Sequence, residues 1–209
     1  MTNGAPTSPP SALRRLDTAN ATALVDLAAT FEDLQTVLRC CERLVQALAE
    51  PAATDGEPDD VMIEAVWTTA LLSYARCFSA AEAGSSLTED DVTSTVSSAE
   101  VLEWHKVLLQ LRDHYADPAL NPREQFSVGV TQNSDGSADG IGITSARQPL
   151  VDDLTVRQTG AIAYALSALV NDRITAQQQS VFSELKNRPQ ADLDALPLVE
   201  FVAPDADPG

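Results

Sequence analysis

The sequence predicts a mainly α-helical protein, a bundle of four or five long helices with one inserted β-hairpin. Apolar residues recur at helical spacing in four long stretches of the chain. One region, about 125–145, instead alternates apolar with small or polar residues on either side of a turn-forming segment. Apolar residues make up 44% of the 209, enough to build one sizeable core.

Composition divides the chain into three parts. We expect residues 1–20 to be a disordered N-terminal tail, because the chain begins with a stretch rich in Pro, Ser, Thr and Gly. Residues 21–187 hold the periodic segments and form one helical domain with the hairpin. Residues 188–209 are expected to be an acidic C-terminal tail, since five acids and no basic residue follow Pro189.

The first helix is predicted over about 22–49, with Asn20 or Thr22 as its N-cap. Eight apolar residues between 24 and 48 alternate spacings of three and four, which is a heptad seam. Such a narrow stripe needs a partner helix, and that helix can belong to the same chain or to a second copy. The seam consists of Leu24, Leu27, Phe31, Leu34, Leu38, Cys41, Val45 and Leu48.

The second helix is predicted over about 60–81, after a linker rich in Pro, Gly and Asp. Asp59 or Asp60 is its expected N-cap. Its apolar face is broad, so we expect this helix to be central and well buried. That face comprises Ile63, Val66, Trp67, Ala70, Leu71, Tyr74, Cys77 and Phe78.

The third helical region is predicted over about 89–116, with acidic residues in its first turn. The pair Ser97-Ser98 marks a point at which this region can break. Pro118 and Pro122 end it, because proline cannot continue a helix.

The hairpin follows, with Phe126, Val128 and Val130 in its first strand and Ile141 and Ile143 in its second. The segment TQNSDGSADG between them contains turn-forming residues throughout. Because an isolated two-stranded hairpin is marginally stable in water, we expect this one to pack on the helices.

The last long helix is predicted over 153 to about 186, with Asp152 or Asp153 as its cap. Beyond it, the apolar stretch 196–202 is expected to dock weakly on the domain.

The net charge of -18 narrows the range of partners. A chain this acidic repels phosphate backbones and anionic membrane surfaces, so nucleic acid is disfavoured except for RNA at a local site, and no membrane association is expected. A basic protein partner fits better. No apolar run reaches the length needed to span a bilayer, and no signal-peptide pattern begins the chain. Eleven Arg against two Lys suggest a GC-rich bacterial genome.

Three cysteines, Cys40, Cys41 and Cys77, form a poor disulfide framework and indicate a cytoplasmic location. With only two histidines, His105 and His114, and no Cys/His cluster, we expect neither a metal site nor a cofactor.

The segment LRDHYADP gathers three chemically versatile side chains, Arg112, Asp113 and His114. Arginine can bind a phosphate with two donors and histidine can move protons near neutral pH, which suits RNA cleavage. Alternatively, His114 complements the helix dipole and Arg112 pairs with an acid. Arg76 could join Arg112 in an anion-binding site, or form a structural ion pair.

The segments ALLSYARCFSA and LRDHYADPALNP, followed by the hairpin and a long helix, resemble the HEPN-like helical superfamily over about 60–185. The resemblance implies a homodimer and, in catalytic members, a ribonuclease of a phage-defence or toxin–antitoxin type. The family motif is Arg, a polar residue, four to six positions, then His. Arg112 and Asp113 match its first two positions, but residues 116–120 contain no His.

We therefore expect a noncatalytic helical interaction or regulatory protein, a degenerate HEPN-like member. The alternative is a HEPN-like ribonuclease in which Arg112 acts with His114 as a substitute base. The sequence identifies neither the partner, the substrate nor the process.

Overall fold

The computed structural model describes residues 13–49, 59–79, 86–95 and 99–199. Within these ranges, four long helices, two short helices and one two-stranded antiparallel sheet confirm the predicted fold class. In chain order the elements are α1 (Ala19–Ala49), α2 (Asp60–Arg76), α3 (Glu89–Thr95), α4 (Ala99–Ala116), β1 (Glu124–Gln132), β2 (Ala138–Arg147), α5 (Asp153–Leu185) and α6 (Gln190–Asp194).

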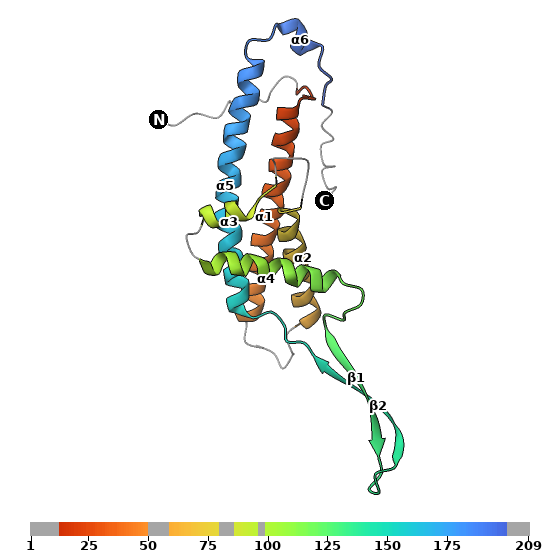
Figure 1. The fold of residues 1–209 in the computed structure, drawn as a ribbon. Helices are drawn as coiled ribbons and strands as arrows, with labels where there is room; N and C mark the ends of the chain where they lie inside the picture. The colour runs from red at the N-terminus through yellow and green to blue at the C-terminus, as the bar shows by residue number, and fades with distance from the viewer. Residues whose placement is uncertain (1–12, 50–58, 80–85, 96–98, 200–209) are drawn as a thin grey trace, which may run out of the picture.

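The two longest helices, α1 and α5, lie side by side and run in opposite directions (Figure 1). Helix α2 packs on α1, α4 crosses over α2, and α3 contacts both α4 and α5. The side chains enclosed by these helices form one hydrophobic core. We call α1–α5 together the helical body.

Helix α1 buries a wider stripe than the predicted heptad seam. Leu27, Leu34 and Cys41 of the seam are buried, but Val37 and Leu44, which lie outside it, have no exposed surface at all. The reason is that α1 packs against two helices, α5 and α2, rather than one. The structure thus provides partners for the seam within the chain.

Two of the helix caps are as predicted and one is not. The side chain of Asp59 accepts a hydrogen bond from Met62 N at 3.0 Å, and that of Asp152 accepts one from Thr155 N at 2.7 Å. Helix α1 begins earlier than predicted, and Thr18 caps it by accepting from the backbone N–H of Ala21 at 3.2 Å. The expected cap Asn20 instead bonds through its side chain to α5.

Helix α2 ends at Arg76 rather than 81, because residues 77–79 form a turn whose Cys77 carbonyl accepts from Leu87 N at 2.9 Å. The third predicted helical region is two helices, α3 and α4. The break predicted at Ser97-Ser98 lies outside the described residues.

Helix α3 is held to α5 by a buried carboxylate. Asp91 is 8% exposed and accepts hydrogen bonds from Arg173 of α5 and from the backbone and hydroxyl of Thr88. Burial alone would raise the pKa of Asp91, but these hydrogen bonds outweigh it and the pKa is lowered.

One polar pair lies inside the core, between α2 and α4. The hydroxyl of Tyr74 lies 2.9 Å from His105 Nδ1, and both side chains are buried. Burial lowers the pKa of His105, so its imidazole is neutral at pH 7. The hydrogen bond satisfies two polar groups that water cannot reach.

Parts of the two predicted tails pair with each other. Arg15 N donates to Pro197 O and Val199 N donates to Leu13 O, both at 2.8 Å. The Arg14 side chain donates to the carbonyls of Asp194 and Leu196. Residues 196–199 of the stretch expected to dock therefore pair with residues 13–15. The start of α1 and the whole of α6 also fall within the predicted tails, and residues 1–12 and 200–209 lie outside the described residues. No helix in the described part of the chain is long and apolar enough to cross a membrane.

Candidate functional site

The hairpin of β1 and β2 projects from the end of the helical body, and we call it the β arm (Figure 1). The prediction that it packs on the helices is wrong. Its apolar side chains are between 56% and 73% exposed, whereas the core of the body is closed. With strands of nine and ten residues, the arm reaches about 30 Å outward.

The two faces of the β arm differ in chemistry. The register pairs Val128 with Ile143 and Val130 with Ile141, so these four side chains share one face with Phe126. We call these five residues the apolar face. The opposite face carries small or polar residues only, namely Gln125, Ser127, Gly129, Thr131, Gly140, Gly142, Thr144 and Ala146.

The tip of the arm is built by its own hydrogen bonds. Asn133 N donates to Ser137 O at 2.9 Å, and Asp135 accepts from the Ser137 hydroxyl and backbone N–H. Those bonds lower the pKa of Asp135. Gly136 has a φ of 84°, which a residue with a Cβ rarely adopts.

Two ion pairs fasten the root of the arm to the first turns of α2. Arg147 Nη2 lies 2.6 Å from Asp60 Oδ2, and Arg123 Nε lies 2.8 Å from Glu64 Oε1. The two carboxylates are only 20% and 17% exposed, because they are one helical turn apart on the side of α2 that meets the arm. Gln148 N also donates to Arg123 O at 2.8 Å, which closes the hairpin at its base. These contacts set the direction in which the arm leaves the body.

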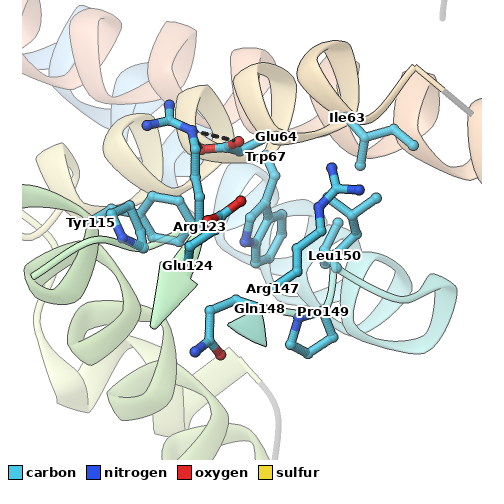
Figure 2. Close-up of a pocket in the computed structure, with 12 residues that line it drawn as sticks. Ile63, Glu64, Trp67, Tyr115, Arg123, Glu124, Arg147, Gln148, Pro149 and Leu150 are labelled. Atoms are coloured by element: carbon cyan, nitrogen blue, oxygen red, sulfur yellow. Dashed lines mark hydrogen bonds and ion pairs between the residues drawn. The ribbon is translucent and has the colours of Figure 1, made fainter. Parts of the chain in front are cut away.

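A cavity of about 230 Å³ lies at this root (Figure 2). Trp67 and Tyr115 come from the helical body, Arg147 ends β2, and Arg123 directly precedes β1. Burial and the nearby Glu64 raise the pKa of Tyr115, although Arg123 opposes them, so the phenol stays protonated at neutral pH. Both arginines are already paired with carboxylates. The cavity therefore lies at the junction of the β arm and the helical body.

The predicted site residues on α4 are engaged locally. Arg112 Nε lies 2.7 Å from Asp113 Oδ1, close enough for an ion pair. This buried nitrogen nevertheless has no well-aligned hydrogen-bond acceptor among the described residues. His114 is exposed, and its ring meets the Tyr115 ring edge-on with centroids 6.3 Å apart. These contacts agree with the alternative interpretation, in which Arg112 pairs with an acid and His114 lies at the end of the helix.

Arg76 does not join Arg112. It points to solvent with 69% of its side chain exposed and pairs with Asp33 of α1 at 2.9 Å. Tyr115, close to Arg112 in sequence, lies beside Trp67 and Glu64 near the start of α2. Arg76 ends the same helix twelve residues after Glu64, which places it about 18 Å farther along the axis. The structure therefore forms no anion site from these two arginines.

Sequence reasoning missed the four residues that orient the β arm. A usable signal was present, since Arg123 and Arg147 flank the predicted hairpin and Asp60 and Glu64 are spaced by four on one helix. Periodicity identified the apolar face correctly but could not show that none of the described residues covers it.

The described residues contain no group of three or more His, Cys, Asp or Glu side chains that could hold a metal ion. All three cysteines are free. Burial raises the pKa of Cys41 and of Cys77 to about 12, and it also raises that of the half-buried Cys40.

Searches for similar proteins returned no matching family model, no matching curated protein and no matching solved structure. The HEPN-like resemblance stays a prediction.

Proposed function

We propose that this protein is a noncatalytic interaction protein, in which the helical body carries the β arm and the arm presents its apolar face to a protein partner. One observation carries the proposal: five large apolar side chains, each more than half exposed, lie together on one face of a projecting element. Contiguous exposed apolar surface of this kind commonly marks a contact site.

The candidate catalytic residues give little support to an enzyme. Arg112 is paired with Asp113, Arg76 is paired with Asp33, and the exposed His114 near the end of α4 contacts the Tyr115 ring. As a HEPN-like protein this chain would be a degenerate member. Free, reduced thiols fit a cytoplasmic place of action.

Site-specific photo-crosslinking in the cells that produce the protein tests this proposal. A photoreactive amino acid at Val128 lies on the apolar face, and one at Gln179 lies on the exposed surface of α5 as a matched control. We expect discrete protein adducts from position 128 that mass spectrometry can identify and that position 179 does not give. Identical adduct patterns at the two positions would show that the arm is not the site of contact with a partner.

A ribonuclease assay tests the noncatalytic part. Purified wild-type protein and Arg112→Ala are expected to leave single-stranded RNA equally intact. Cleavage by the wild type that is lost in Arg112→Ala would instead establish the ribonuclease alternative.

A further inference from the structure

We infer that the partner of the apolar face is the apolar face of a second copy of this chain, so that two β arms pack face to face across a two-fold axis. The inference rests on the proposed function, because it names the partner of the same surface. Its basis is the shape, area and charge of the arm.

An isolated β arm leaves its hydrophobic face without cover. Two-stranded hairpins are marginal in water unless a third strand or another layer packs on them. The part of the chain that the structure describes supplies no such layer, since Val128, Ile141 and Ile143 are 71%, 73% and 72% exposed. A second arm laid on the first supplies one and converts two open hairpins into a small two-layer sandwich.

The apolar face suits a two-fold interface. Such an interface requires one patch that is complementary to itself. Here β-branched side chains occupy both strands, with Val128 opposite Ile143 and Val130 opposite Ile141. An antiparallel pair of arms therefore places similar aliphatic side chains against one another, with Phe126 towards each end.

The available area is sufficient for a weak dimer. Two apolar faces together expose on the order of 1,000 Å², which is the lower bound for a specific interface. Association is therefore expected to depend on concentration.

The charge distribution also favours the arm as the place where two copies meet. The chain carries a net charge of -18, so two helical bodies repel each other. Between residues 125 and 146 the only charged residues are Asp135 and Asp139, next to the turn at the tip. The arm holds the bodies apart while the uncharged apolar faces touch. Added salt screens the repulsion between bodies and should strengthen this dimer, whereas it would weaken a complex with a basic partner.

Sedimentation velocity over a range of protein concentrations tests the inference with matched variants. Val128→Lys places a charge on the apolar face, and Ser127→Lys places the same charge one residue away on the opposite face. We expect the wild type and Ser127→Lys to dimerise alike and Val128→Lys to dimerise at least about tenfold more weakly. A second pair, Ile143→Thr and Thr144→Val, repeats the comparison with uncharged changes, and circular dichroism checks that every variant keeps its helices.

Dimerisation that strengthens with salt and is lost only in the apolar-face variants supports the inference. A wild type that stays monomeric throughout, or a dimer that both lysine variants retain equally, overturns it. If the wild type is monomeric and photo-crosslinking at Val128 captures a different protein, the proposed function stands and the second-copy inference fails. Loss of that complex in salt would identify the partner as basic.

Discussion

The helical body and the β arm contain similar aliphatic side chains, but the body buries them and the arm exposes them. Leu34, Leu166 and Val170 have no exposed surface in the body, whereas Val128 and Ile143 of the arm keep more than 70% of theirs. The body surrounds its apolar residues with four long helices, but the arm is only two paired strands, which ion pairs attach to the body at their root. Apolar surface therefore stabilises the fold in one region and is available for association in the other.

The largest expected effect is on the core of the body. Leu166→Ala should lower the free energy of unfolding by about 2–5 kcal/mol, because it removes a fully buried side chain and leaves a cavity. Ile143→Ala in the arm should change it by less than about 0.5 kcal/mol. Urea unfolding at low protein concentration measures both. Equal losses would mean that the arm is part of the core.

Asp91→Ala should cost about 1–3 kcal/mol, because Arg173 and Thr88 lose a shared acceptor between α3 and α5. Asp113→Ala, which removes a more exposed carboxylate, is the control and should cost no more than about 1 kcal/mol. The same urea titration compares them, and a smaller loss for Asp91→Ala than for Asp113→Ala contradicts the assignment.

His105 should make the stability of the body depend on pH. The pKa of His105 is lower in the folded protein, so the unfolded chain binds the proton more readily. The neutral imidazole therefore makes its whole contribution to stability above the pKa of the unfolded chain, about 6.5. As the pH falls below that value, the free energy of unfolding should fall. Thermal unfolding between pH 7.5 and 5 measures the slope, and His105→Phe should reduce it. A slope unaffected by this change would assign the dependence to other groups.

The root ion pairs should affect the direction of the arm more than the stability of the body. Asp60→Asn with Glu64→Gln is expected to cost about 0–1 kcal/mol, because both guanidinium groups are largely exposed. A dye attached at Ser137→Cys, in a chain whose Cys40 is changed to Ser, should show faster depolarisation when the pairs are removed. Unchanged depolarisation would show that the backbone alone holds the arm.

Local signals in the sequence predicted most of the fold. Spacings of three and four located the long helices, Asp59 and Asp152 marked two starts, and alternation located the hairpin. These features depend on neighbouring residues. The start of α1 was missed because Asn20, a good capping residue, is used in a contact with α5 that the sequence does not reveal.

Features that depend on distant segments were harder to predict. Arg76 was expected either to join Arg112 or to form a structural ion pair, and it forms an ion pair with Asp33 of α1, a partner that the sequence did not identify. Alternation showed that one side of the hairpin is apolar, but a period of two does not state what covers that side. The sequence consequently indicated a candidate site on α4, whereas the structure indicates one on the β arm.

Hydrogen exchange measured by mass spectrometry at several protein concentrations tests the central claim most directly. If the apolar face is open within one chain and is covered by a second copy, peptides from 124–147 should exchange quickly at low concentration and become protected as concentration rises. Peptides from the centre of α5 should be protected equally at every concentration. An arm as protected as α5 at the lowest concentration would contradict the account, because its apolar face would then be packed on its own helices.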